Sequence, residues 1–368
     1  MNKTGNQLIN FLEEVSQACI QCGKCQDECV FLKEFNIDPK TFAENLLKQG
    51  HIEDPALIYS CNLCGICGEI CPAEIDLKRI FLLLREEMAE QGGEQPLSLQ
   101  WVKERLEWIN KGGFLFSTGE KCENAFFPGC TLSGYNPRLV LETYDYLKNQ
   151  NSSTGIVLNC CGAPFEGLGA KSEFADTLKT IRAQIEKIGS SRIITACPNC
   201  YRIFREYLPG YELTTVYEIM EKGELPKPKT KITGNEHFFL FHSCSIRGER
   251  EIQRAIRSLI EKLGFRVTEE AGAGSKIRCC GMGGMVGLSN PVLASIIGAE
   301  RTEGITHDIV TYCAACRDAL VQFQPCIHLL DLIFNPQWEQ AKESQPLEDT
   351  QARENLTWLK TELEKCTI

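Results

Sequence analysis

The chain of 368 residues lacks the features that mark membrane-spanning, secreted or nucleic-acid-binding proteins. Its densest apolar stretch, IFLLL at 80–84, is far shorter than the roughly 18 apolar residues that cross a bilayer. The N-terminal MNKTGNQLINFLEEV contains no unbroken apolar segment of the signal-peptide kind. Acidic residues outnumber basic ones by 49 to 39, which argues against a nucleic-acid partner. We therefore expect a soluble cytoplasmic protein that reaches a membrane only peripherally, through a partner.

Nucleotide-binding motifs are also absent. The glycine-rich GMGGMVG at 281–287 has no Lys-Ser/Thr of a P-loop and does not fit G-x-G-x-x-G. Glycines there are better explained by close backbone approach and N–H···S contacts to a metal cluster. The 5 histidines form no spaced pair, so we expect them to be structural. Flavin or nicotinamide chemistry would need a partner subunit.

Cysteine, by contrast, is abundant, with 21 residues. In a reducing compartment a disulfide framework is not expected, and grouped thiols are best explained as soft ligands for iron–sulphur clusters or zinc. All but three cysteines fall into four groups. The three without a motif, which we expect to be ordinary thiols, are Cys122, Cys326 and Cys366.

Two groups follow the ferredoxin spacing C-x₂-C-x₂-C-x₃-C, in which the fourth thiolate reaches across to the other cluster. We expect one cubane 4Fe–4S cluster on Cys19, Cys22, Cys25 and Cys71, and another on Cys61, Cys64, Cys67 and Cys29. Gly23, Gly65 and Gly68 should ease the backbone around them. Two zinc sites are the alternative, although zinc ligands come in two separated pairs. Pro72 follows the second run as in ferredoxins, whereas Val30 follows the first.

The surroundings of these runs predict helices. Residues 38–50 have Asp38 as an N-cap, Pro39 at the first helical position and Gly50 at the end. Apolar periodicity predicts further helices over 74–93 and 98–110, with Trp101, Leu106 and Ile109 packing in a core. A mostly helical N-terminal region is therefore expected.

The other two cysteine groups repeat each other. Landmarks FFPGC, NCCG and CPNC recur in the same order as FHSC, RCCG and CAAC, each about 115 residues later. The first set is Cys130, Cys160, Cys161, Cys197 and Cys200, and the second is Cys244, Cys279, Cys280, Cys313 and Cys316. Neighbouring cysteines are too close to pair as an ordinary disulfide. The repeat indicates a duplicated domain that gathers five thiolates in each copy.

Short apolar stretches precede most of these cysteines. We predict strands at AFFPG, GIVLN, RIITA, HFFLF and DIVTY, with helices such as 172–189 between them. Alternating strands and helices imply small parallel sheets with ligands at the strands' carboxyl ends. The predicted fold is therefore a helical dicluster ferredoxin domain followed by two duplicated α/β domains. The expected boundaries are 1–95 (ferredoxin), 96–120 (helical linker), 121–225 and 235–335 (the two copies) and 336–368 (helical tail).

The repeated pattern resembles the cysteine-rich CCG domain, two of which form the catalytic subunit of heterodisulfide reductase from methane-producing archaea. With the ferredoxin region ahead, residues from about 15 to 335 resemble the catalytic chain of the two-subunit enzyme. They are also similar to the iron–sulphur subunits of glycolate oxidase and anaerobic glycerol-3-phosphate dehydrogenase. The N-terminal region itself is similar to the helical ferredoxin domain of fumarate reductase iron–sulphur subunits.

This resemblance implies that each complete five-cysteine set holds a non-cubane 4Fe–4S cluster and that a disulfide is cleaved between them. The ten cysteines of the two sets would then be catalytic and the eight ferredoxin cysteines would bind the cubane clusters. Zinc or a cubane cluster in one or both CCG sites stays open. The implied partners are a flavoprotein or other electron-donor subunit, a membrane cytochrome or quinone-linked partner, and a small disulfide or thiol.

Two functions remain as hypotheses: a heterodisulfide-reductase-like oxidoreductase subunit, and an electron-transfer subunit of a flavin-dependent dehydrogenase that feeds a quinone pool. Arg247, Arg278 and Arg317 flank the second cysteine set and suggest an anionic substrate or partner there. Ordinary ion pairs are the alternative for these arginines. In the tail, the run LTWLKTEL is expected to pack on the body or on a partner.

Overall fold

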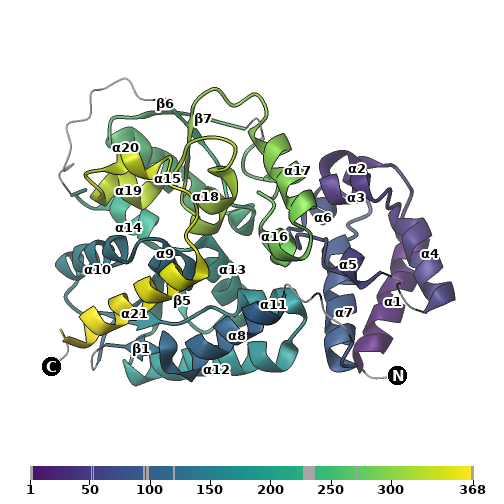
Figure 1. The fold of residues 1–368 in the computed structure, drawn as a ribbon, viewed down its shortest axis with the longest axis horizontal. Helices are drawn as coiled ribbons and strands as arrows, with labels where there is room; N and C mark the ends of the chain where they lie inside the picture. The colour runs from purple at the N-terminus through teal and green to yellow at the C-terminus, as the bar shows by residue number, and fades with distance from the viewer. Residues whose placement is uncertain are drawn as a thin grey trace. The chain divides into compact units, whose positions relative to one another are not determined.

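A computed structural model describes residues 3–50, 52, 54–93, 96, 99–118, 121–226, 237–270 and 272–365 (Figure 1). Their contacts divide the chain into two compact units. The first unit comprises Met1–Glu104, Pro164–Phe174 and Ser275–Arg301, and the second comprises Arg105–Ala163, Ala175–Gly274 and Thr302–Ile368. Cys366, and residues 227–234 between the expected boundaries of the two copies, lie outside the described residues. No helix in the described ranges combines the length and apolarity needed to span a bilayer.

The first unit is helical where it is described. Its N-terminal elements are α1 (Lys3–Ala18), α2 (Lys24–Glu28), α3 (Val30–Glu34), α4 (Pro39–Gln49), α5 (Pro55–Ile58), α6 (Ile66–Glu69) and α7 (Leu77–Glu90). Later segments add η4 (Gly283–Met285), α16 (Val286–Ser289) and α17 (Pro291–Thr302). Four of the described helices contain a residue at which the chain passes from one unit to the other: α8 (Gln100–Trp108), α11 (Ala163–Leu168), α12 (Lys171–Lys187) and α17.

The predicted helix at 38–50 is confirmed with its caps. The Asp38 carboxylate accepts a hydrogen bond from the Thr41 N–H at 2.9 Å, Pro39 begins α4, and Gly50 ends it with φ 74°. Helix α1 packs against α4 and α7, and the Phe81 ring of α7 lies 5.1 Å from the Phe31 ring. Burial of such aromatic side chains supplies most of the stability of a small helical region.

Two sheets form the framework of the second unit. Their strands are β1 (Phe116–Ser117), β2 (Asn124–Phe127), β3 (Thr154–Leu158), β4 (Arg192–Thr195), β5 (Glu212–Thr215), β6 (His237–Leu240), β7 (Arg266–Glu269), β8 (Asp308–Thr311) and β9 (Cys326–His328). All five predicted strands are present, as β2, β3, β4, β6 and β8. Strands β1, β5, β7 and β9 were not predicted from the sequence.

The two sheets have the same topology, which confirms the duplication. Apart from the antiparallel edge strand β1, the first sheet has the order β3-β2-β4-β5 and the second has the order β7-β6-β8-β9. Every other pairing is parallel, with Phe126 opposite both Ile156 and Ile194. In each sheet the chain switches side at the first strand, and the carboxyl ends of strands at such a switch point open a crevice for ligands.

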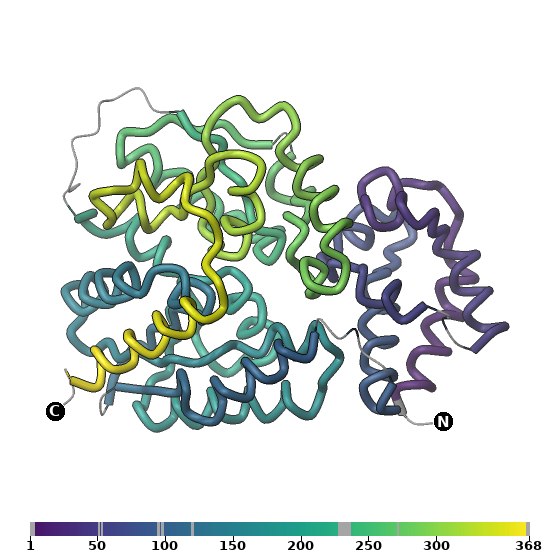
Figure 2. Tube along the Cα trace, viewed as in Figure 1, coloured from purple at the N-terminus to yellow at the C-terminus, as the bar shows by residue number. Residues whose placement is uncertain are grey.

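Helices surround these sheets. They are η2 (Ile109–Gly113), α9 (Cys130–Tyr135), α10 (Pro137–Gln150), α12 (Lys171–Lys187), α13 (Pro198–Tyr207), α14 (Val216–Lys222), η3 (Cys244–Ile246), α15 (Arg250–Lys262), α18 (Ala314–Leu320), α19 (Leu329–Phe334), α20 (Trp338–Ala341) and α21 (Asp349–Lys365). The C-terminal α21 returns to α9 and α10 of the first copy (Figure 2). Its Leu356, Leu359 and Leu363 are buried, so the prediction that the tail packs on the body is confirmed.

Candidate metal centres

The two ferredoxin runs adopt the same loop conformation. Gln21 and Leu63 occupy equivalent places between the first two cysteines, and both are left-handed, with φ 54° and 51°. Gly23 and Gly65 follow the second cysteine with φ 77° and 74°, as the sequence analysis expected. Gly68 serves a different purpose, because a Cβ there would lie 3.1 Å from the Cα of Asp76.

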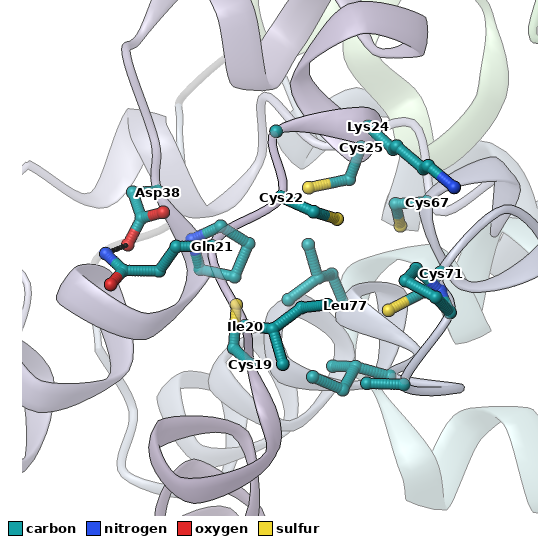
Figure 3. Close-up of a pocket in the computed structure, with 15 residues that line it drawn as sticks. Cys19, Ile20, Gln21, Cys22, Lys24, Cys25, Asp38, Cys67, Cys71 and Leu77 are labelled. Carbon is teal, nitrogen blue, oxygen red and sulfur yellow. Dashed lines mark hydrogen bonds between the residues drawn. The ribbon is translucent and has the colours of Figure 1, made fainter.

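The first run and the last cysteine of the second run surround one pocket. Cys19, Cys22, Cys25 and Cys71 line it together with Cys67, and their sulphur atoms are directed into the same space (Figure 3). The pocket has an empty volume of about 420 Å³, part of it open to solvent. The structure thus brings together the four thiols assigned to the first cubane cluster.

The second run is close to the last cysteine of the first run. Burial raises the pKa of Cys29 to about 12, and the charges of Cys64 and Cys61 add to that rise. Burial likewise raises the pKa of Cys67, with contributions from Cys61, Cys64 and Cys29. These mutual effects place Cys29 near the thiols of the second run, and the exchange of fourth ligands stays a prediction of the spacing.

The donor chemistry of both places fits a cube of iron and sulphide. A cube takes one thiolate at each of four irons, so its ligands surround a space rather than a point. Among the described residues, no three Cys, His, Asp or Glu side chains are arranged as ligands of a single metal ion. Burial also raises the pKa of Cys25, to about 11, so this thiol is protonated until a metal displaces the proton.

In the second unit, the first five-cysteine set gathers at the carboxyl ends of three neighbouring strands. Cys130 follows β2, Cys160 and Cys161 follow β3, and Cys197 and Cys200 follow β4. Consecutive hydrogen bonds link all five sulphur atoms, from Cys130 to Cys160, Cys161, Cys200 and Cys197. Three loops that are distant in sequence therefore deliver five sulphur donors to one buried place, which fits a thiolate-bound cluster.

These hydrogen bonds divide the thiols into donors and acceptors. The bond from Cys160 lowers the pKa of Cys130, and bonds from Cys160 and Cys200 lower the pKa of Cys161 well below its usual value. The pKa of Cys160 is raised correspondingly. Cys197 is the N-cap residue of α13.

Gly129 allows the first loop to approach the third. It precedes Cys130 with φ 87°, and a Cβ there would lie 2.9 Å from the Cβ of Cys197 and 3.1 Å from the Sγ of Cys200. Both the conformation and the contact exclude a larger residue. The glycine of FFPGC is the sequence signal for this position, and its role was not predicted from the sequence.

The second five-cysteine set is divided between the units. Cys244, Cys313 and Cys316 belong to the second unit, where the hydrogen bond from Cys316 lowers the pKa of Cys313 against the effect of burial. Cys279 and Cys280 belong to the first unit, where the Gly281 N–H donates to the Sγ of Cys279 at 3.4 Å. The expected N–H···S contact of the glycine-rich loop is confirmed, while the grouping of all five thiols stays a prediction.

A buried tyrosine joins the C-x₂-C loops of the two copies. The Tyr217 hydroxyl lies 3.0 Å from the carbonyl oxygen of Ala196 and 3.2 Å from that of Tyr312. These carbonyls immediately precede Cys197 and Cys313. The two loops are therefore held within reach of one hydroxyl group.

A second contact connects the same region to the loop of Cys244. The Ser245 hydroxyl is hydrogen-bonded to the Asn199 side-chain oxygen, and Asn199 lies between Cys197 and Cys200. Helix α13 packs against η3, which begins at Cys244. Cysteine-bearing loops of both copies thus meet inside the second unit.

The arginine hypothesis is wrong for Arg317. That side chain is fully buried and donates to Asp318 at 2.9 Å and to the hydroxyl of Ser344 at 2.7 Å, so it cannot face a substrate. Arg278 forms an ion pair with Glu300 at 3.0 Å, which agrees with the alternative explanation that these arginines make ordinary ion pairs.

The described histidines nearest to cysteines are structural, as predicted. His242 is buried, with its ring nitrogens 3.0 Å from the Tyr312 hydroxyl and 2.7 Å from a Glu269 carboxylate oxygen. The hydrogen bond to His242 lowers the pKa of Glu269 to about 2, with help from Arg257. His328 caps α19 by accepting from the Leu330 N–H at 3.2 Å. His51 lies outside the described residues.

We expect Tyr217→Phe to lower the free energy of unfolding of the metal-free protein by about 1–3 kcal/mol, since the carbonyls of Ala196 and Tyr312 lose the one hydroxyl proton that they share. Urea titration of the variant and the parent measures the difference. Tyr146→Phe is the matched control, because the buried Tyr146 hydroxyl has no hydrogen-bond partner among the described residues. Equal losses in both variants would contradict a bridging role for Tyr217.

Comparison with known families agrees with this geometry. Residues 18–76 match the model of a 4Fe-4S dicluster domain, and residues 124–205 and 238–320 each match the model of the cysteine-rich CCG domain. No solved structure gives a significant match.

Curated relatives extend over most of the chain. A fumarate reductase (CoM/CoB) subunit of Methanothermobacter marburgensis is 24% identical over 369 residues, covering 87% of this chain and 72% of the relative. A subunit of the dihydromethanophenazine:CoB–CoM heterodisulfide reductase of Methanosarcina barkeri is 21% identical over 357 residues, covering 82% and 85%. An EtfAB:quinone oxidoreductase of Syntrophomonas wolfei is 21% identical over 347 residues, covering 73% of this chain and 48% of the relative. The chain belongs to the family of iron–sulphur electron-transfer subunits that join a 4Fe-4S dicluster domain to two cysteine-rich CCG domains.

Proposed function

We propose that this oxidoreductase subunit interconverts a small disulfide and two thiols at its CCG domains. In the reducing direction one S–S bond breaks, two electrons and two protons are taken up, and two thiols leave. The electrons come from a reduced flavoprotein partner subunit and the protons from solvent. No flavin or nicotinamide motif occurs in the chain, so the reductant belongs to another subunit of the complex.

Four sets of thiols would hold the clusters in this proposal. Two cubane clusters would bind the sets Cys19, Cys22, Cys25, Cys71 and Cys29, Cys61, Cys64, Cys67. Two non-cubane clusters would bind the sets Cys130, Cys160, Cys161, Cys197, Cys200 and Cys244, Cys279, Cys280, Cys313, Cys316. When bound, such clusters supply one-electron transfer and, at the CCG sites, iron that can bind sulphur.

One observation carries the proposal: the cysteine loops of the two CCG copies meet at Tyr217. Its hydroxyl bonds to the carbonyls before Cys197 and Cys313, and Asn199 bonds to Ser245 beside Cys244. A subunit that only transfers electrons needs cluster sites that follow one another along a single path. Two thiolate sites side by side can instead act on both sulphur atoms of one disulfide, because the reaction produces two thiolates at once.

The protein's own groups would keep that place dry and ordered. The loop residues around Tyr217 are buried, including Ala196, Tyr312 and Cys313. Backbone N–H groups of Ala315 and Cys316 and the Ser243 side chain lower the pKa of Cys313, after the larger effect of the Cys316 thiol. Such preorganised donors favour sulphur in its anionic form.

A second function is supported by one of the relatives. The similarity to a protein named EtfAB:quinone oxidoreductase favours transfer from a flavoprotein to a quinone-linked partner, without bond chemistry in this chain. Here the CCG sites would hold cubane clusters or zinc. The two proposals differ in what the CCG sites do with a thiol.

EPR spectroscopy of the anaerobically purified protein, oxidised with and without a panel of biological thiols, separates them. We expect a paramagnetic signal that requires a thiol and that is absent from a Cys160→Ser, Cys161→Ser variant. Metal analysis of the same sample should return iron and sulphide rather than zinc. A protein with all clusters in place but no thiol-dependent signal, together with turnover in a quinone-linked complex, would support the second function.

A further inference from the structure

Arg85 of α7 is an arginine without any exposed surface, and it is bonded only to backbone carbonyls. Its Nε donates to the carbonyl of Ile58 at 3.0 Å, and its Nη2 donates to that of Cys61 at 2.7 Å. Its Nη1 donates to the carbonyls of Gly167 at 2.7 Å and Gly284 at 2.8 Å. All five residues belong to the first unit.

This buried charge has no carboxylate partner within the described ranges. The Arg85 guanidinium instead lies over the Tyr59 ring, 4.9 Å from its centroid, as a cation–π contact. Burial lowers the pKa of Arg85 to about 10, so the group remains charged at neutral pH. An uncompensated buried cation is costly, and a fold keeps one where a nearby negative charge balances it.

Three of the four bonded carbonyls belong to segments that contain or follow a cysteine motif. Cys61 is a cysteine of the second ferredoxin run, Gly167 lies in the segment that follows Cys160 and Cys161, and Gly284 lies in the segment that follows Cys279 and Cys280. Each CC motif thus leads into a segment that Arg85 holds against the ferredoxin domain. The arginine is the common bond donor of all three.

The glycines of these segments permit the close packing. A Cβ on Gly284, which has φ 55°, would lie 2.4 Å from the Cys61 carbonyl oxygen and 3.2 Å from the Arg85 Nη1. A Cβ on Gly169 would lie 2.3 Å from the Arg85 carbonyl carbon. Larger residues would separate the loops.

A second set of contacts joins the second ferredoxin run to the segment that follows Cys279. The Asn62 side chain donates to the carbonyls of Gly281 at 2.9 Å and Gly283 at 3.2 Å. A Cβ on Gly283 would lie 2.4 Å from the Asn62 carbonyl oxygen and 3.1 Å from the Sγ of Cys279. Asn62, which follows Cys61, is therefore in direct contact with Gly281, which follows the second CC motif.

The two ferredoxin sites differ in charge. At the second site the buried Arg85 guanidinium lies 2.7 Å from the carbonyl oxygen of Cys61, one of the proposed ligands. The pocket of the other site is lined by a lysine, Lys24, but this side chain is exposed and screened by solvent, whereas Arg85 is fully buried. A fixed cation stabilises the more negative, reduced state of a cluster and raises its potential.

We propose that Arg85 is a positioning residue which makes the cluster of the second ferredoxin run the exit cluster of the dicluster domain. Its charge raises the reduction potential of that cluster above that of the first, so electrons collect there. Its four hydrogen bonds hold that cluster's loop against the segments that follow both CC motifs. This inference rests on the proposed function for its direction of electron flow.

The test is an EPR-monitored redox titration of the purified full chain, which needs no substrate. Arg85→Gln should shift one of the two cubane potentials to more negative values and leave the other in place, at unchanged iron content. Arg79→Gln is the matched control, because Arg79 is an exposed arginine on the same helix. Equal potentials in Arg85→Gln and the parent overturn the proposal, even where the thiol-dependent CCG signal is present.

Two further variants separate charge from position. Arg85→Lys keeps the charge but makes fewer hydrogen bonds. The reduction potentials of the two cubane clusters should therefore keep the order that they have in the parent protein. A reversed order overturns the role of the charge. This variant decides the question if Arg85→Gln loads no cluster. Gly284→Ala keeps the charge and displaces the loop, so freeze-quench EPR should show slower reduction of the CCG clusters at unchanged cubane potentials. An unaltered rate overturns the positioning role.

Discussion

Replacing Cys29 by serine is expected to remove the cubane cluster of the second ferredoxin run and to spare that of the first. Cys29 belongs to the first run in sequence, but its thiol lies with Cys61, Cys64 and Cys67. About four irons per chain should be lost, the content of one cluster. Iron analysis and EPR spectroscopy of the reduced protein measure the change.

Four further serine variants, one of them a control, make this test decisive. The spectrum of the Cys29 variant should match that of a Cys64→Ser variant, and a Cys71→Ser variant should match Cys22→Ser, because each pair lacks the same cluster. Cys122→Ser serves as the control and should keep both clusters. A Cys29 variant that instead matched the Cys22 variant would show that each run holds its own cluster without exchange.

Replacing Gly129 by alanine should abolish metal loading of the first CCG site. The added Cβ would meet the Cβ of Cys197 at 2.9 Å and the Sγ of Cys200 at 3.1 Å, at a φ of 87° that only glycine adopts readily. The loop of Cys130 must then move away from that of Cys197, and the five sulphur atoms no longer surround one place. The cubane signals should persist, and the thiol-dependent CCG signal should fall to background.

Gly210→Ala is the matched control, since a Cβ on Gly210 would have no atom within 4 Å. Circular dichroism of the metal-free variants checks that both still fold. Full iron loading and an intact CCG signal in the Gly129 variant would contradict the arrangement of thiols at the ends of β2 and β4.

Local signals in the sequence predicted the elements that bear the cysteines. The capping residues Asp38, Pro39 and Gly50 defined α4 because their effects act within one turn of helix. Apolar stretches before Cys130, Cys160 and Cys197 predicted β2, β3 and β4, since buried parallel strands are apolar on both faces. Strand β7 was missed because RVTE is polar and only half-buried, and it ends well before Cys279.

The buried arginine left a weaker signal. Arg85 follows Phe81 by one helical turn and therefore lies on the apolar face of α7, where a charged residue is unusual. That position could have marked it for attention. Its partners could not be found in the same way, because the carbonyls of Gly167 and Gly284 are bonded only through the folded loops.

The sequence alone determined the chemistry of this protein: the number and spacing of soft thiols, the duplication, and the helices and strands that carry them. Those features depend on residue type and on contacts within a few positions of the chain. The tertiary structure decided which sulphur atoms meet, that one tyrosine joins the two CCG copies, and that one buried charge differs between the two ferredoxin sites. These are contacts between segments far apart in the chain. Many of them are made by backbone carbonyl groups and glycine Cα atoms, so no residue type in the sequence signals them.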